Sequence, residues 1–189
     1  MTADVTLPAR ERLLAAADEL FYAEGVHTVG IDRVIEHAGV AKASLYNTFG
    51  SKEHLVQAYL ERRHQATVDA FRQAVEQHSD PRQRLLAVFD ALAEMFARPD
   101  FRGCAFTAAT AEAPDGGLIR QAADQYRVDI RNLLTELARD TGTADPAALA
   151  QQLQLLYDGS GLAAQLDRDP GIGAAVKAAA AILVDAATD

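Results

Sequence analysis

The sequence has little of what folds outside the all-helical class require. Tryptophan is absent, one cysteine occurs in 189 residues, and aromatic residues make up 6% of the chain. The single cysteine, Cys104, cannot form a disulfide within the chain, which excludes small disulfide-stapled scaffolds. β-branched and aromatic residues are too sparse for a sheet protein, whereas Ala and Leu are plentiful and favour helices. We therefore expect an all-α protein.

Long apolar runs and a leader sequence are missing as well. No stretch of about 18 consecutive apolar residues occurs, so we expect no membrane-spanning helix. The first residues, MTADVTLPARERLL, lack a basic region followed by an apolar stretch, so we expect no secretory signal. Together with the single cysteine, this makes the cytoplasm the default location.

The sequence also has few patterns that carry catalysis or metal binding. It contains no Gly-rich phosphate loop, no G-x-S-x-G, and no cluster of His, Cys and carboxylates at metal-ligand spacing. Cys104 could act as a nucleophile, but no His–acid pairing can be argued near it, and a lone buried cysteine usually packs as a small hydrophobe. We therefore expect neither an enzyme nor a protein with a bound cofactor or metal.

The most informative stretch runs over residues 31–52, IDRVIEHAGVAKASLYNTFGSK, and predicts a helix, a tight turn and a second helix. Apolar residues recur at helical spacing on both sides of the turn: Ile31, Val34 and Ile35 before it, and Val40, Leu45 and Phe49 after it. Gly39 stands where a chain leaving a helix needs a residue that tolerates a positive φ. We expect both helices to bury one narrow stripe.

The opposite face of the second helix carries short hydrogen-bonding side chains and one cation: Lys42, Ser44, Tyr46, Asn47 and Thr48. Such side chains suit base edges and phosphates in the major groove of DNA. Ser51 is a good N-cap for the next helix, whose first N–H groups can hold a phosphate.

At this point the sequence resembles a known family. The run GVHTVGIDRVIEHAGVAKASLYNTFGSKEHL resembles the DNA-binding domain of the TetR-type transcriptional regulators, through A-G-V, L-Y-x-x-F and x-S-K-E-x-L at fixed offsets. The resemblance covers about residues 10–63. It implies a three-helix helix-turn-helix domain over 9–60 and a helical domain over 61–189 that binds an effector and dimerises. The chain departs from the family at Gly30 and Ala41, where Ser or Thr is common, and at Thr48, where His is frequent.

The resemblance and the helical pattern together give the expected contacts with double-stranded DNA. Tyr46 and Lys52 are expected at phosphates, and Asn47 at a base edge. The full set is Arg10, Thr28, Lys42, Ser44, Tyr46, Asn47, Thr48 and Lys52. The alternatives are an ordinary solvated face for Lys42 and Ser44, a solvated first turn for Arg10, and a surface ion pair of Lys52 with Glu53 or Glu61.

The net charge of −9 needs to be divided along the chain before it is compared with DNA binding. Residues 1–63 carry seven cations against nine acids, and residues 64–189 carry eleven against eighteen. Phosphate binding depends on where cations lie, not on the whole-chain sum. We expect modest non-specific affinity for DNA and specific binding by a dimer with two such domains.

Further helices are expected over 52–77, 81–97, 101–112, 118–139, 146–166 and 172–187. In the family the middle helices surround an effector pocket, and the resemblance implies these lining candidates: Phe89, Leu92, Phe96, Cys104, Phe106, Tyr126, Leu133 and Tyr157. Polar groups could come from Tyr126, Tyr157, Asp158 and Thr107. The alternative for all of them is a plain packed core.

The last two helices are rich in small residues. Gly159-Ser160-Gly161 lies inside the first of them, and the second is mostly Ala, so another helix can approach closely. In the family these two helices form the homodimer interface. The expected function is a repressor that releases a palindromic operator when a small hydrophobic effector binds. The alternative is a DNA-binding dimer with no small-molecule switch, regulated by abundance or by a protein partner.

Overall fold

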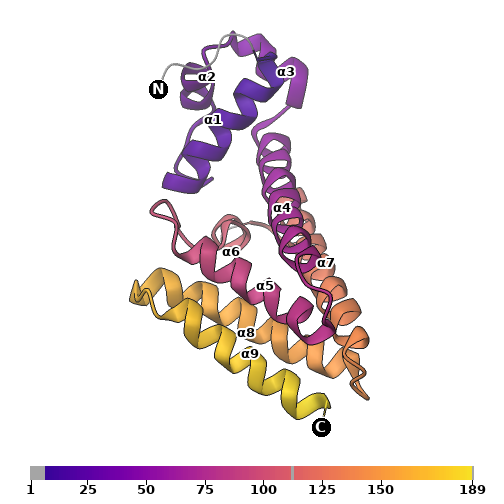
Figure 1. The fold of residues 1–189 in the computed structure, drawn as a ribbon. Helices are drawn as coiled ribbons and strands as arrows, with labels where there is room; N and C mark the ends of the chain where they lie inside the picture. The colour runs from indigo at the N-terminus through magenta and orange to yellow at the C-terminus, as the bar shows by residue number, and fades with distance from the viewer. Residues whose placement is uncertain (1–6, 112, 189) are drawn as a thin grey trace. The chain divides into compact units, whose positions relative to one another are not determined.

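The computed structural model describes residues 7–111 and 113–188, and all regular structure in these residues is helical (Figure 1). The helices are α1 (Ala9–Glu24), α2 (Ile31–Ala38), α3 (Lys42–Phe49), α4 (Lys52–Glu76), α5 (Pro81–Phe96), α6 (Ala105–Thr110), α7 (Leu118–Asp140), α8 (Pro146–Asp167) and α9 (Ile172–Thr188). The all-α prediction is confirmed. The predicted boundaries hold to within a few residues, except that α6 begins later than expected, after Gly103 in a turn with φ 94°.

The contacts divide the chain into two compact units that interleave along the sequence. The first comprises Met1–His64 and Ala105–Asp124, and the second comprises Gln65–Cys104 and Gln125–Asp189. Helix α6 and the first turns of α7 therefore belong with the N-terminal helices. The predicted functional boundary near residue 60 stays a prediction, because it concerns which part binds DNA and which part binds an effector.

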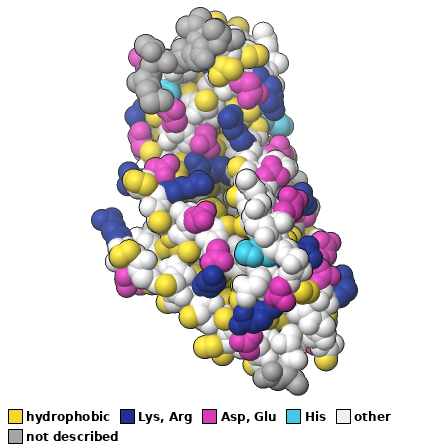
Figure 2. Space-filling model, viewed as in Figure 1, with side chains coloured by type: hydrophobic (Ala, Val, Ile, Leu, Met, Phe, Trp, Pro, Cys, Tyr) yellow, Lys and Arg dark blue, Asp and Glu magenta, His cyan; other side chains and the backbone are white. Residues whose placement is uncertain are grey.

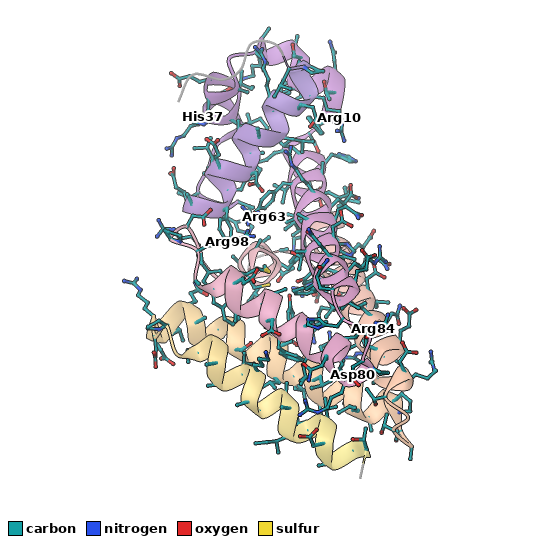
Figure 3. The ribbon with its side chains drawn as sticks, viewed as in Figure 1. Arg10, His37, Arg63, Asp80, Arg84 and Arg98 are labelled. Atoms are coloured by element: carbon teal, nitrogen blue, oxygen red, sulfur yellow. The ribbon has the colours of Figure 1, made fainter. Side chains whose placement is uncertain are left out.

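The core of the first unit forms where α1 packs against α2 and α3. Leu13, Val34 and Leu45 are fully buried there. The middle of α4 is tied to α1 by Arg63 (labelled in Figure 3), whose Nε and Nη2 donate to the two carboxylate oxygens of Asp18 at 2.8 and 3.0 Å. Its guanidinium also stacks 3.6 Å from the centroid of the Tyr22 ring. These contacts fix the direction in which α4 leaves the first three helices.

The turn between α2 and α3 has the backbone geometry that the sequence predicts. Gly39 adopts φ 62° and ψ 40°, a left-handed conformation that strains residues with a Cβ. Its N–H donates to the carbonyl oxygen of Glu36 at 3.1 Å, and its own carbonyl oxygen accepts from Arg12 Nη2 at 2.8 Å. The turn is thus held by backbone geometry and by α1.

In the second unit α5, α8 and α9 lie side by side (Figure 1), with α9 packed against both of the others. Asp80 caps α5 by accepting from the Gln83 N–H at 2.9 Å, with Pro81 at the first helical position. A Cβ on Gly173 of α9 would lie 2.6 Å from the Cβ of Ala93 on α5. Close approach of these two helices therefore requires glycine at 173.

None of the helices in the described residues is both long enough and apolar enough to cross a membrane.

Candidate nucleic-acid interface

Helix α3 separates into the two faces that its sequence predicts. Leu45 is its one fully buried side chain, and Phe49 is half-buried, with the Arg10 guanidinium 5.7 Å from its ring centroid. On the other side, four predicted contact residues are exposed, namely Lys42, Tyr46, Asn47 and Thr48. A fifth, Ser44, is half-buried. The helix is anchored by one narrow stripe and presents its polar face outward.

The polar face of α3 carries hydrogen-bonding groups that have no partner in the described part of the chain. Tyr46 and Asn47 make no side-chain hydrogen bond with any described residue, although Tyr46 is a large and exposed aromatic. Thr48 differs, because its Oγ1 donates to the carbonyl oxygen of Ser44 at 2.6 Å. Tyr46 and Asn47 are consequently the residues best placed to bind a partner by hydrogen bonds.

The N-termini of α2 and α3 are not capped by side chains. Their N-cap residues are Gly30 and Ala41, and neither has a side chain that accepts a hydrogen bond from the first turn. The first N–H groups of a helix attract anions when nothing else satisfies them. The two departures from the family pattern thus remove hydroxyl groups and leave the first N–H groups of both helices without a side-chain acceptor. Thr28, which is exposed, lies two residues before Gly30.

The N-terminus of α4 is capped as predicted, and it carries a cation. Ser51 Oγ accepts from the His54 N–H at 3.2 Å. Lys52 follows it, half-buried, and this burial lowers the pKa of its ammonium group. Lys52 forms no ion pair with a described residue, so the predicted alternative of a pair with Glu53 or Glu61 is not formed. Glu53 instead accepts from the Leu118 N–H at 3.3 Å.

Most other cations of the first unit are held in ion pairs on its surface. The pairs are Arg10–Glu11, Arg33–Glu24, Lys42–Asp32, Arg62–Glu11, Arg63–Asp18 and Arg120–Asp115. Figure 2 shows basic and acidic side chains interspersed over the face in view. The coloured side chains of this face form no concentrated positive patch, and modest non-specific affinity for DNA stays a prediction. Asp32 was not identified from the sequence as the partner of Lys42. The one sequence feature that could have indicated it is an acid in the first turn of the preceding helix.

The predicted pocket residues differ in burial. Phe89, Leu92 and Tyr126 are buried in the second unit; Phe96, Cys104, Leu133 and Tyr157 are half-buried there; and Phe106 is buried in the first unit. Of the proposed polar groups, Thr107 is exposed in the first unit, and Asp158 forms an ion pair with Arg127 at 2.8 Å.

Two tyrosine hydroxyls are the most distinctive polar feature of the second unit. Those of Tyr126 and Tyr157 hydrogen-bond to each other. Burial of the hydroxyls raises the pKa of both tyrosines well above the ordinary value, so both stay neutral at physiological pH. The Tyr157 ring also meets Phe71 edge-on, with centroids 6.0 Å apart. An uncharged pair of hydrogen-bonded hydroxyls results, with Thr67 also hydrogen-bonded to Tyr126 and Asp158 near both hydroxyls. Within the residues the structure covers, no group of His, Cys and carboxylates could hold a metal ion.

Comparison with known families matches both halves of the chain. Residues 13–59 match the family described as bacterial regulatory proteins, tetR family. Residues 81–180 match the family described as tetracyclin repressor-like, C-terminal domain. The second match alone covers more than half of the chain.

Individual relatives are similar in sequence and in structure. The transcriptional repressor NemR of Escherichia coli K12 is 28% identical over 169 residues, 84% of this chain and 85% of the relative. The transcriptional activator FasR of Mycolicibacterium smegmatis is 43% identical over 88 residues, and this match spans only 40% of its length. The crystal structure of SCO4454, a TetR-family transcriptional regulator from Streptomyces coelicolor, superposes with a TM-score of 0.91 at 32% identity over 96% of both chains.

Proposed function

The chain belongs to the TetR family of bacterial DNA-binding transcriptional regulators, and from this we propose that it is a homodimeric repressor that releases a palindromic operator when a small organic effector binds. The observation that carries the proposal is the exposed polar face of α3, with the unpaired Tyr46 and Asn47 beside the uncapped N-termini of α2 and α3. A regulator of this kind acts on DNA, so we place it in the cytoplasm.

In the proposed complex α3 lies in the major groove, and each group has a role set by its chemistry. The Asn47 amide reads a base edge, because its donor and acceptor pair can match an adenine. Tyr46 and Lys52 contact phosphates, and Lys42, Ser44 and Thr48 lie at the groove. Arg10 and Thr28 contact the DNA backbone, which the open N–H groups of α2 also approach.

An apolar stripe on the last two helices supports a homodimer. Leu155, Gly159, Leu162 and Leu166 recur at helical spacing along α8 and are all exposed, with Leu155 at 65%. On α9, Ile182 is 69% exposed among alanines. Exposed apolar surface of this kind is usually covered by a partner. Apart from the helix's own nearby backbone, no described residue comes within 4 Å of a Cβ placed on Gly159, so a second copy of α8 can approach there.

A two-fold dimer would present two copies of α3 to successive major grooves, about 34 Å apart on one face of the duplex. That geometry demands a palindromic operator. A ligand can alter the separation of the two α3 helices only through a difference in its affinity for the DNA-bound and free states. Helix α4 is the proposed link, because it begins in the first unit and continues into the second.

The buried hydroxyl pair of Tyr126 and Tyr157 supports an uncharged or weakly polar effector, since two neutral hydroxyl groups can donate and accept without binding a charge. Repression is proposed over activation as the usual mode of the family. The relatives named above include a repressor and an activator.

The test is a DNA-binding measurement on the full chain with the fragment upstream of its own coding region, followed by a footprint. We expect a palindromic protected region, and we expect Asn47→Ala to abolish the specific shift. The matched control is Asn132→Ala, which changes an exposed asparagine on α7. Tyr46→Phe and Lys42→Ala are expected to weaken binding without unfolding the protein. Unchanged affinity in Asn47→Ala, Tyr46→Phe and Lys42→Ala would show that α3 is not the recognition surface.

The effector is tested separately, with a set of small hydrophobic compounds. A compound that raises the melting temperature and also releases the operator supports the proposal. If every compound leaves both quantities unchanged, the chain is instead a DNA-binding dimer with no small-molecule switch.

A further inference from the structure

The first turns of α2 and α3 are joined by an ion pair that the fold does not require. Lys42 Nζ lies 2.7 Å from Asp32 Oδ1, and the two side chains are 59% and 77% exposed. Exposed ion pairs of this kind add little to stability. The turn between the helices is already held by the left-handed Gly39 and by Arg12, which donates to the Gly39 carbonyl oxygen. The pair therefore calls for an explanation other than stability.

The same pair lies where DNA phosphates are expected. Both residues belong to helix first turns whose N-caps, Gly30 and Ala41, supply no side-chain acceptor for the backbone N–H groups. A carboxylate and a phosphate offer a lysine ammonium group the same ligand, an anionic oxygen. In the free protein the Asp32 carboxylate holds the ammonium group that, under the proposed function, a phosphate would hold in the complex.

We propose that Asp32 competes with DNA phosphate for Lys42 and thereby lowers the affinity of the protein for DNA that lacks the operator sequence. The inference rests on the proposed function, in which Lys42 contacts DNA. Lys42 can reach a phosphate only by leaving Asp32, and the carboxylate is then left close to the negatively charged backbone. On the operator, base contacts by Asn47 compensate for this exchange. On other sequences they do not, so Asp32 acts as a repulsive element that sharpens specificity.

A purely structural role for Asp32 makes a different prediction. An acid in the first turn of a helix interacts favourably with the helix dipole. If that is its whole contribution, Asp32→Asn will lower the melting temperature slightly and leave DNA binding unchanged.

The experiment compares the full-length wild type with Asp32→Asn, which keeps the side chain's shape and removes its charge. Fluorescence anisotropy measures binding to a short mixed-sequence duplex and to the operator fragment over a series of KCl concentrations. The matched control is Glu36→Gln, which makes the same charge change on the exposed surface of α2. A second set of measurements repeats Asp32→Asn in a Lys42→Ala background.

We expect Asp32→Asn to bind the mixed-sequence duplex about two- to fivefold more tightly at about 0.1 M salt, and to gain less on the operator. If Lys42 now neutralises an additional phosphate, the plot of log K against log salt steepens by about 0.9. Glu36→Gln should show a smaller gain, and in the Lys42→Ala background Asp32→Asn should show none.

The inference is overturned if Asp32→Asn leaves the mixed-sequence affinity unchanged, if Glu36→Gln raises it as much, or if the gain persists without Lys42. In these cases the wild type still binds its operator, and the proposed function stands. A folded wild type that binds neither duplex overturns the proposed function and this inference together.

Discussion

Helix α3 depends on one side chain, and replacing that side chain should separate DNA binding from the stability of the rest of the chain. An isolated eight-residue helix is not stable in water, so α3 persists only through its contacts with α1 and α2. Leu45 is its one fully buried residue. Leu45→Ala removes three buried carbons and leaves a cavity, which costs about 3 to 5 kcal/mol. That is a large share of the roughly 5–15 kcal/mol that stabilises a typical domain.

The assay is hydrogen exchange of peptides that cover α3 and α5, together with operator binding. We expect Leu45→Ala to lose amide protection in α3 and to lose operator affinity, while α5 in the second unit stays protected. Val128→Ala is the control, because Val128 is exposed on α7 and its truncation should change stability by less than about 0.5 kcal/mol. A Leu45→Ala protein with normal protection in α3 and normal operator affinity would refute the reasoning, and would mean that the half-buried Phe49 is sufficient to hold the helix.

Three further predictions concern the second unit. Gly173→Ala should destabilise the protein by about 1–3 kcal/mol in urea unfolding, because the new Cβ would lie 2.6 Å from the Cβ of Ala93. This overpacking outweighs the better helix propensity of alanine. A gain in stability would contradict the close contact of α5 and α9. Because burial raises the pKa of Tyr126 and Tyr157, the native state keeps phenol protons that the unfolded chain releases. The free energy of unfolding should therefore fall as pH rises above about 10, by up to about 1.4 kcal/mol per pH unit for each tyrosine, and a double Phe variant with the same slope would exclude these groups as the cause. Gly159→Glu should convert the proposed dimer into a folded 20.3 kDa monomer in sedimentation experiments. The new side chain has open space in the protomer but would collide with a second copy at the proposed interface. A dimer of unchanged stability would place the interface elsewhere.

The helices and the central turn could be predicted from the sequence because local physics determines them. Apolar residues at i, i+3 and i+4 fix which face of α2 is buried, and Val34 and Ile35 are indeed in the core. Gly39 marks the turn because few other residues accept a left-handed backbone. Ser51 marks the start of α4 because its hydroxyl accepts a hydrogen bond from the first turn.

The grouping of the chain into units could not be predicted in the same way, because contacts between distant segments decide it. The ring nitrogen Nε2 of His27 lies 3.3 Å from the carbonyl oxygen of Ala109, and Glu53 accepts from the N–H of Leu118. These contacts span 82 and 65 residues, and neither has a periodic signal. They join α6 and the first turn of α7 to the unit that contains α3, a grouping that no local sequence pattern indicates.

The effector pocket could not be predicted from the sequence for a different reason. Apolar side chains at helical spacing can line a cavity or fill a packed core. The spacing that buries Phe89 and Leu92 therefore does not distinguish a pocket from a core. The polar groups are more informative, and they depend on tertiary structure. Only in the fold do the hydroxyls of Tyr126 and Tyr157, 31 residues apart, meet.

The ion pairs of the first unit bear on how the proposed DNA recognition would work. They suggest that its cations exchange an internal acid for a phosphate, and that general electrostatic attraction to DNA contributes less. Its described cations outside Lys52 are already paired with acids or hold the backbone, so under the proposed function each phosphate contact of Arg10 or Lys42 would replace an internal one. A cation that must give up an ion pair gains less free energy from a phosphate than an unpaired cation would. We therefore expect binding to arbitrary DNA to stay weak. The uncharged groups of Tyr46 and Asn47 have no hydrogen-bond partner to lose among the residues that the structure describes. Hydrogen bonds from these two residues therefore add to binding in full when the correct bases lie opposite them, and a wrong sequence leaves the protein in its internally paired state.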